Sequence, residues 1–470
     1  MDRRTFLKHA GAGSAAMALG VSSCGKNREP EVTDSGKRPN IIFLLTDDQR
    51  WDTLGCMGNS IIRTPNLDGL AQNGVLFRNC FVTTPICCAS RASIFTGQYA
   101  RRHGINDFST DFTPAQFADI YPSVLRRDGY FSGFVGKYGI NNREEDMPKN
   151  DFDVWYGIAG QPVYETKDDK GNDIHSTRLY GNQCMDFLRQ CPDDRPFHLS
   201  VSFKAPHVQD GDPRQFIPDP AYDDLYSDVT IPVPMTADPR YFDMLPGFLK
   251  DSEARRRWEL RFATPEMYQQ SVKNYYRLIT GVDVVVGDIM NELDLLGMAD
   301  NTIIVFSGDN GFYLGEHGLA GKWFGHEESL RVPLFVYDPR LPRDLRGQVR
   351  DEMVLNVDIA PTLLSACSSS IPSSYQGNDL MPLVRNESTV WREDFLFEHL
   401  FRHEKIQRSE GVVGTRWKYL RYIDQEPVYE ELYDRVGDPL DERNIAGEQA
   451  NTDLLGQMRN RCDELTEMYS

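Results

Sequence analysis

The chain has 470 residues, of which 40% are hydrophobic and 26% are charged, so its composition is that of an ordinary globular protein. This length allows one large hydrophobic core and a smaller second domain. Its 70 acidic and 51 basic residues give a formal net charge of −19. The excess of acid argues against nucleic acid as a partner, because phosphates require a basic surface. An anionic ligand would have to meet local positive charge inside a cleft.

The first 24 residues have the pattern of an export signal and not of a folded segment. A twin arginine, Arg3-Arg4, precedes a weakly apolar run over residues 10–21 that is too short to span a bilayer. The twin arginine resembles a Tat signal, and residues 21–24, Val-Ser-Ser-Cys, resemble a bacterial lipobox. The sequence leaves open whether Cys24 is lipidated or a plain signal is cut nearby. We therefore expect an exported bacterial protein, either periplasmic or a cell-surface lipoprotein that meets the membrane only through this anchor.

Beyond a polar tether over residues 25–39, strands and helices are predicted to alternate along the chain. Continuous apolar runs predict buried strands over residues 40–46, 133–136, 198–203, 301–306 and 332–337. Helical patterns lie over residues 65–73, 117–127, 177–189 and 265–296. This alternation predicts an α/β fold with a large, mostly parallel sheet.

The α/β domain is predicted to span residues 40–374, because the composition then turns to serine and proline. Residues 375–470 are predicted to form a smaller α+β domain. Within it, residues 411–422 alternate like one antiparallel strand, and a helical pattern begins at about residue 451.

Two pairs of polar residues follow predicted strands and carry oxygen ligands. Asp47-Asp48 follows the first strand, and Asp309-Asn310 follows the strand at 301–306. Either pair alone is explained as well by a turn or a helix cap. Because ligand sites gather at the carboxyl ends of parallel strands, we expect all four side chains at one edge of the sheet. Such ligands favour Ca²⁺, or Mg²⁺, over zinc.

Residues 84–97 hold the most specific motif of the chain, Thr-Pro-Ile-Cys-Cys-Ala-Ser-Arg-Ala-Ser-Ile-Phe-Thr-Gly. Taken alone, Cys87 and Cys88 could be buried structural thiols and Ser90 a helix cap. However, Cys-x-Ala-Ser-Arg followed by Ala-Ser-x-x-Thr-Gly resembles the signature of the type I sulfatases. These are formylglycine-dependent, arylsulfatase-like enzymes of the alkaline phosphatase superfamily. Most members have proline where this chain has Ala89.

The resemblance implies an alkaline-phosphatase-like fold and a role for each motif. In this family a maturation enzyme oxidises the first signature cysteine, here Cys87, to formylglycine. One hydroxyl of the hydrated aldehyde attacks sulfur, and the second later expels sulfate. The implied metal ligands are Asp47, Asp48, Asp309, Asn310 and modified Cys87. The implied catalytic residues are Arg91 beside the formylglycine, Lys137 and Lys322 as sulfate contacts, and His207 as the acid for the leaving alcohol.

One position departs from the family pattern. Gly139 stands where the family has a histidine that is often thought to help regenerate the aldehyde. His103 and His175 are alternatives for this base, although each is better explained as a packing or surface residue. His317 and His326 flank Lys322, and we predict that they contact the substrate, with a structural role as the alternative for His326.

The sequence therefore predicts hydrolysis of a sulfate monoester, and export favours a sulfated carbohydrate as the substrate. A phosphonate or phosphate ester hydrolase on the same scaffold is the alternative among hydrolases. An inactive carbohydrate-binding protein is the alternative from another class. Only Gly139 favours that reading, because the predicted nucleophile and the three metal-binding aspartates are all present.

Overall fold

The structure is a computed structural model, and it describes residues 37–387 and 389–470. The predicted signal peptide, the lipobox residue Cys24 and most of the predicted tether lie outside the described residues. Within those residues, no helix is both long enough and apolar enough to cross a membrane.

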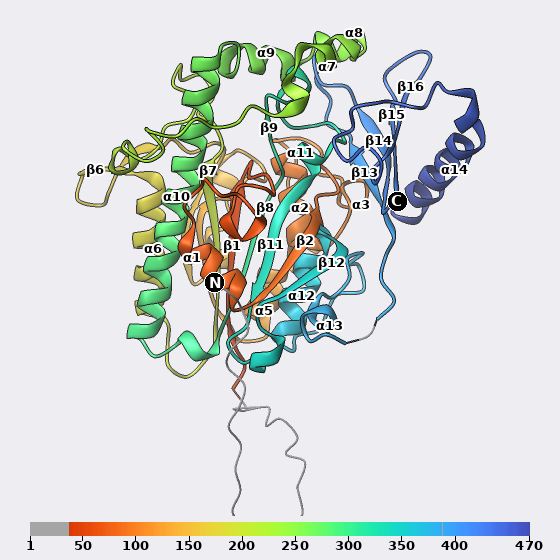
Figure 1. The fold of residues 1–470 in the computed structure, drawn as a ribbon. Helices are drawn as coiled ribbons and strands as arrows, with labels where there is room; N and C mark the ends of the chain where they lie inside the picture. Colours follow the sequence, from red (N-terminus) through yellow and green to blue (C-terminus); the bar gives the residue numbers. More distant parts are fainter. Residues whose placement is uncertain (1–36, 388) are drawn as a thin grey trace, which may run out of the picture.

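The centre of the molecule is a large, mostly parallel sheet (Figure 1). In the described part of the chain, eight strands form it in this order: β12 (Gln348–Leu355), β2 (Val75–Phe81), β11 (Arg331–Tyr337), β8 (Thr302–Gly308), β1 (Asn40–Asp47), β7 (Phe197–Pro206), β3 (Phe131–Lys137) and β4 (Val154–Ile158). β11 runs antiparallel to both of its neighbours, whereas the other pairs are parallel. The predicted α/β fold class is confirmed.

Helices cover both faces of this sheet, as Figure 1 shows. The long helices α6 (Ser176–Gln190) and α10 (Pro265–Leu295) pack on one face, together with α1 (Pro65–Gln72). The opposite face carries α2 (Cys87–Thr96), α5 (Tyr121–Arg127) and α12 (Ile359–Ala366). Alternate residues of β1 enter the two cores, Phe43 on the α2 side and Leu44 on the α10 side. Burial on both faces explains why these strands read as continuous apolar runs.

The single helix predicted over residues 117–127 is wrong. The chain forms α4 (Pro114–Asp119) and then α5, separated by Ile120 in an extended conformation (φ −62°, ψ 147°). Pro122 lies in the first turn of α5, where a proline is tolerated. In the middle of one long helix, its ring would clash with the preceding turn.

A second, antiparallel sheet follows near the C-terminus. Its strands are β13 (Asp394–His399), β14 (Ser409–Gly414), β15 (Trp417–Tyr422) and β16 (Tyr429–Asp434), and α14 (Thr452–Met468) packs against it. The single strand predicted over residues 411–422 is wrong, because the chain reverses at Thr415-Arg416 to form the β14–β15 hairpin. The smaller α+β domain is confirmed, while its boundary at residue 374 stays a prediction.

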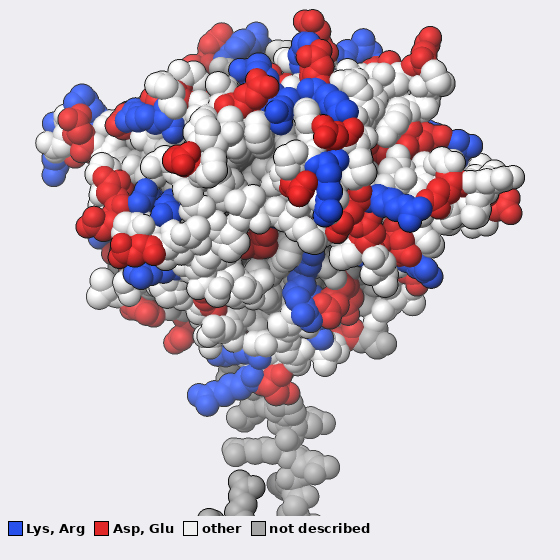
Figure 2. All heavy atoms as spheres, turned by 45° about the horizontal axis from the view of Figure 1, so that its top comes forward, with Lys and Arg blue, Asp and Glu red and all other residues white. Residues whose placement is uncertain are grey.

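Short elements complete the fold. The hairpins are β5 (Glu165–Lys167) with β6 (Asp173–His175), and β9 (Tyr313–Leu314) with β10 (Ala320–Gly321). The short helices are α3 (Ala100–His103), α7 (Pro239–Met244), α8 (Gly247–Lys250), α9 (Glu253–Arg261), α11 (Glu327–Leu330) and α13 (Met381–Val384). On the face in Figure 2, basic side chains are interspersed with acidic ones, whereas nucleic-acid binding calls for a continuous basic stripe.

Candidate active site

The predicted metal ligands lie at one edge of the large sheet. Asp47 is the last residue of β1, and Asp309-Asn310 directly follows β8, the parallel neighbour of β1. The Asp48 backbone N–H donates to Asp309 Oδ1 at 3.1 Å, and Asn310 Nδ2 donates to Asp48 Oδ1 at 2.7 Å. The register of two adjacent strands thus brings together four of the five side chains predicted to hold a metal, Cys87 being the fifth.

This cluster fits a divalent cation bound through oxygen. Asp47 Oδ1 and Asn310 Oδ1 are buried and accept no hydrogen bond from any described residue. Buried oxygens without a partner are costly, so they indicate a ligand. One ligand atom each of Asp47, Asp48 and His207 lies within 4.8 Å of the others, close enough to share one ion. His207 directly follows β7, the other neighbour of β1, so strand order also brings the predicted acid to this edge of the sheet.

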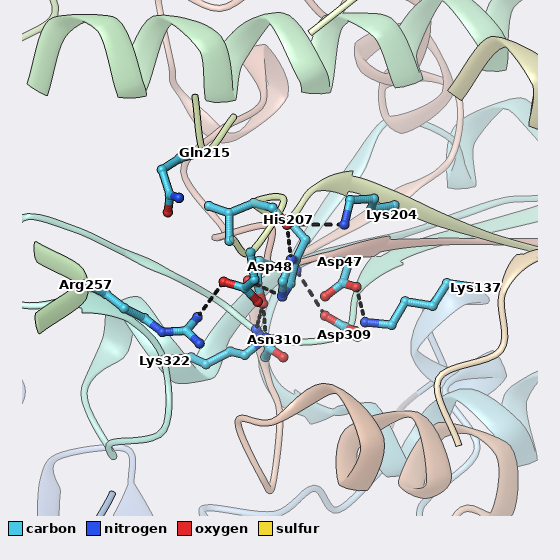
Figure 3. Close-up of polar contacts among 12 residues, drawn as sticks. Asp47, Asp48, Lys137, Lys204, His207, Gln215, Arg257, Asp309, Asn310 and Lys322 are labelled. Atoms are coloured by element: carbon cyan, nitrogen blue, oxygen red, sulfur yellow. Dashed lines mark hydrogen bonds and ion pairs between the residues drawn. The ribbon is translucent and has the colours of Figure 1, made fainter. Parts of the chain in front are cut away.

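Three buried cations pair with the three carboxylates, and Figure 3 shows two of them, Lys137 and Lys322, approaching from different sides. The pairs are Lys137 with Asp47, Lys322 with Asp48, and Arg91 with Asp309. Lys137 Nζ lies 2.5 Å from its carboxylate oxygen, and Arg91 Nε donates to Asp309 at 2.8 Å. Burying an unpaired charge costs several kcal/mol, so removing one partner would leave the other exposed to that penalty.

Burial and the neighbouring charges shift the pKa values of Asp47 and Asp309 in opposite directions. Burial opposes ionisation of Asp47, but Lys137, His207 and Arg91 outweigh it and hold its pKa well below the ordinary value. Burial and repulsion from Asp47 raise the pKa of Asp309 to about 6. A cation placed between two such carboxylates relieves their repulsion, so the arrangement favours metal binding.

Cys87 begins α2 and lines a pocket of about 250 Å³ together with His207 and Lys322. The side chain of Cys87 is buried, and burial raises the pKa of its thiol. A thiol with a raised pKa is a poor nucleophile, so this environment does not suit unmodified cysteine chemistry. A larger cavity of about 960 Å³ lies elsewhere and contains none of the predicted catalytic residues. Chemistry and not size therefore identifies the candidate site.

His207 is oriented by the backbone beside it. Its Nδ1 is 2.6 Å from the Val208 carbonyl oxygen, and its Nε2 is 3.5 Å from Asp48 Oδ2. Because a carbonyl can only accept, Nδ1 carries the proton and Nε2 is directed toward the cluster. Burial lowers the pKa of His207 to about 3, so its ring is neutral near pH 7. Lys204, which sequence reasoning missed, donates to the same carbonyl at 3.2 Å.

Gly139 lies where a larger residue would not fit. Its φ is +78°, and a Cβ there would lie 2.5 Å from Arg91 Cδ.

The two alternative bases, His103 and His175, make hydrogen bonds away from the pocket. His103 Nε2 is hydrogen-bonded to Ser93 Oγ at 3.1 Å, and His175 caps α6 through its Nδ1. Neither lines the pocket that contains Cys87.

His317 and His326 lie together in a different cavity, of about 450 Å³, and neither lines the pocket of Cys87. His326 Nδ1 is 2.6 Å from the Tyr313 hydroxyl, and its Nε2 is 3.6 Å from Glu431 Oε2. The chain around Lys322 turns sharply, with left-handed backbone at Gly315, His317, Gly318, Gly321 and Trp323. Proximity in sequence therefore does not carry these histidines into the pocket, and their contact with a substrate stays a prediction.

Comparisons with known proteins agree with this geometry. A family model described as Sulfatase matches residues 39–369, and a second, N-sulphoglucosamine sulphohydrolase, C-terminal, matches residues 315–468. A model of the twin-arginine translocation signal matches residues 1–20, so the chain carries an export signal.

Curated relatives cover most of the chain. An N-acetylglucosamine-6-O-sulfatase of Bacteroides thetaiotaomicron is 27% identical over 96% of this chain and 90% of its own length. An ulvan-active sulfatase of Formosa agariphila is 27% identical over 96% of this chain and 86% of its own length.

Solved structures share the fold. One is a complex with its substrate, D-glucosamine-2-N,6-O-disulfate; it has a TM-score of 0.76 at 26% identity and covers 92% of this chain and 98% of its own. A phosphonate monoester hydrolase of Agrobacterium radiobacter has a TM-score of 0.72 at 20% identity, covers 92% of this chain and 96% of its own, and shows the fold alone. The chain therefore belongs to the sulfatase family, and the predicted enzyme class, a sulfatase, is confirmed.

Proposed function

We propose that this protein hydrolyses sulfate monoesters of carbohydrates, with Cys87 converted to formylglycine as the nucleophile. The observation that carries the proposal is the position of Cys87 at the start of α2, in one small pocket with His207 and Lys322. The relatives named for N-acetylglucosamine sulfate and for ulvan support a sulfated carbohydrate as the substrate class.

The paired cations are proposed to bind and orient the sulfate group. Lys322 lines the pocket, whereas Lys137 is not among the lining residues and pairs with Asp47. Arg91 donates to Asp309 and to the carbonyl of Lys137, so it holds the cluster in place beside Cys87. Preorganised cations of this kind stabilise the charge that moves between sulfur and the departing oxygen.

His207 is proposed to deliver a proton to the leaving alcohol. Its Nε2 points toward the cluster, and the Val208 carbonyl fixes the ring from the other side. A sugar alkoxide is a poor leaving group, so its protonation during bond cleavage lowers the activation barrier substantially. The ring must acquire this proton once an anion occupies the pocket, because burial otherwise keeps it neutral.

A divalent metal and the formylglycine made from Cys87 complete the proposal. The side chains of Asp47, Asp48, Asp309 and Asn310, with modified Cys87, would hold Ca²⁺, and Mg²⁺ is the second choice for such oxygen ligands. The metal would polarise the sulfate oxygens, and the hydrated aldehyde would supply the attacking hydroxyl. The proposal therefore requires a formylglycine-generating enzyme as a partner in maturation. The final location, periplasm or cell surface through a lipid on Cys24, is proposed from the sequence alone.

Peptide mass spectrometry across residues 84–91 tests the proposal, on protein produced with and without a formylglycine-generating enzyme. We expect the mass of Cys87 to change from that of the thiol to that of the aldehyde, and turnover of 4-nitrophenyl sulfate to appear only with the conversion. Cys88→Ala is the matched control and should still convert. An intact thiol beside a converted control sulfatase would contradict the mechanism and favour a carbohydrate-binding protein.

A further inference from the structure

The rim of the Cys87 pocket carries a pair of oppositely charged side chains, Arg257 and Asp210, that the proposed chemistry does not use. Arg257 on α9 and Asp210, three residues after His207, both line the pocket. Figure 3 shows Arg257 reaching toward Asp48 and His207 from the side opposite Lys137. If the sulfate binds beside Cys87, these two side chains would face the alcohol part of the ester.

Arg257 is fixed in place but keeps free donors. Its Nε donates to Glu253 Oε1 at 2.8 Å, and its guanidinium lies 5.0 Å from the centre of the Trp323 ring. Its Nη1 is 3.5 Å from Asp210 Oδ1, which is longer than a good hydrogen bond. Within the described residues, neither Nη group donates a hydrogen bond. An arginine held in place at a pocket wall can donate its unused N–H groups to oxygen atoms of a ligand in the pocket.

Asp210 supplies the complementary acceptor. Its carboxylate is 49% exposed and lies 3.5 Å from Arg257 and 3.7 Å from Arg261 Nη2. Neither of its oxygens accepts a hydrogen bond from the described part of the chain. Adjacent hydroxyls of a sugar ring offer both a donor and an acceptor, so a carboxylate and a guanidinium side by side match them.

The aromatic wall fits one sugar ring. Trp323 is 4% exposed and holds a left-handed backbone (φ 91°), which is strained for a bulky side chain. Backbone strain of this kind is often retained at binding sites, and here the left-handed conformation places the indole ring in the pocket wall, one residue after Lys322. Phe108 and Phe401 meet edge to face at 5.9 Å and also line the pocket. The volume of about 250 Å³ is below the ~300–1,000 Å³ of pockets that enclose drug-sized ligands.

We propose that Asp210 and Arg257 are the specificity-determining residues of this pocket, and that they select a single terminal sugar whose groups beside the sulfate are uncharged hydroxyls. This inference rests on the proposed function and adds the substrate class. A second sulfate or a carboxylate at Arg257 would lie within a few ångströms of the Asp210 carboxylate and would compete with it and with Glu253. Like charges placed this close repel, so the pair rejects doubly charged rings.

The test compares two substrates and two readouts on converted protein. We expect Asp210→Ala and Arg257→Ala each to lower kcat/KM for a 6-O-sulfated hexose by about 10- to 100-fold, the usual weight of a hydrogen bond to a charged group. Turnover of 4-nitrophenyl sulfate, which has no ring hydroxyls, should change by less than about threefold. Asp210→Asn and Arg257→Lys should recover part of the loss. Asp173→Ala, on an exposed hairpin, is the matched control.

Binding separates this inference from the proposed function. In Cys87→Ala protein, calorimetry should show the monosulfated sugar binding at least 10-fold more tightly than its disulfated counterpart, and Asp210→Ala should remove that preference. Sugar binding that neither rim substitution changes, or equal losses on sugar and 4-nitrophenyl sulfate, would overturn the inference. Sugar binding that depends on Asp210 without any turnover by converted protein would contradict the proposed function but would still support the role of Asp210 in selecting the sugar.

Discussion

Restoring the family histidine at Gly139 is expected to damage the enzyme and not to improve it. The left-handed backbone (φ +78°) costs a residue with a Cβ about 1–2 kcal/mol. A Cβ there would also lie 2.5 Å from Arg91 Cδ and 3.0 Å from its Nε, well inside the ~3.5–4.0 Å of favourable contact. Arg91 must therefore move if any side chain is added.

The cost of moving Arg91 follows from its contacts. Its side chain is 1% exposed, and it donates from Nε to Asp309 and from Nη1 to the Lys137 carbonyl and to Ser202. Breaking a buried ion pair costs about 3–5 kcal/mol, and a partial shift costs some fraction of that. We expect Gly139→Ala to lower the free energy of unfolding by about 2–5 kcal/mol, and Gly139→His to lower it by more.

Gly171→Ala separates strain from collision, because Gly171 has a similar φ of +83° with nothing within 4 Å of the added Cβ. Urea denaturation should assign about 1–2 kcal/mol to Gly171→Ala. Turnover of 4-nitrophenyl sulfate should fall at least tenfold in Gly139→Ala and stay unchanged in Gly171→Ala. Equal stability of the two alanine variants, or higher activity in Gly139→His, would refute the reasoning, because Arg91 would then move at no cost.

Three further outcomes follow from the site. Dialysis against EGTA should lower both Tm and turnover of the wild type, and added Ca²⁺ should restore them. The Tm of Asp47→Asn should respond less to either treatment. Calcium at 100 times its Kd adds about 2.7 kcal/mol to the free energy of unfolding. His207→Gln should reduce kcat more for a sugar sulfate than for 4-nitrophenyl sulfate, whose leaving group needs no proton, and equal losses would argue against acid catalysis. Burial lowers the pKa of His103 to about 3, whereas its pKa in the unfolded chain is about 6.5, so between these values only the unfolded chain gains a proton there. The free energy of unfolding should therefore fall by about 2 kcal/mol for this residue as the pH drops from 6.5 to 5. His103→Gln should flatten that pH dependence.

The metal site follows from strand order, which is why the sequence predicts it well. Parallel strands end at the same edge, so acids that directly follow two buried apolar runs must lie near one another whenever those runs are neighbours. Asp47 and Asp309 meet this condition because β1 pairs with β8. The Cys87 motif is equally local, since its residues from Cys87 to Thr96 form one helix, α2.

The rim of the pocket could not be predicted in the same way, because its residues come from segments with no common pattern. Arg257 lies on a polar helix more than a hundred residues from the motif of Cys87, and Phe401 belongs to the second domain. Backbone reversals add a further obstacle. His317 has a left-handed φ of 54°, which the sequence does not indicate, and such turns take it into another cavity than Lys322.

The balance of charge at the site explains how a chain with a net charge of −19 can attract an anion. Three buried carboxylates are matched by three buried cations, so without a metal the cluster has little net charge. A divalent ion would leave an excess of two positive charges in a pocket of low dielectric, where Coulomb interactions are several times stronger than in water. Attraction of a sulfate ester would then depend on the metal, and by linkage the bound ester would strengthen metal binding by the same factor. If the proposed function holds, the lysines would act in two states of one site: they would stabilise the carboxylates before the metal binds and the sulfate afterwards.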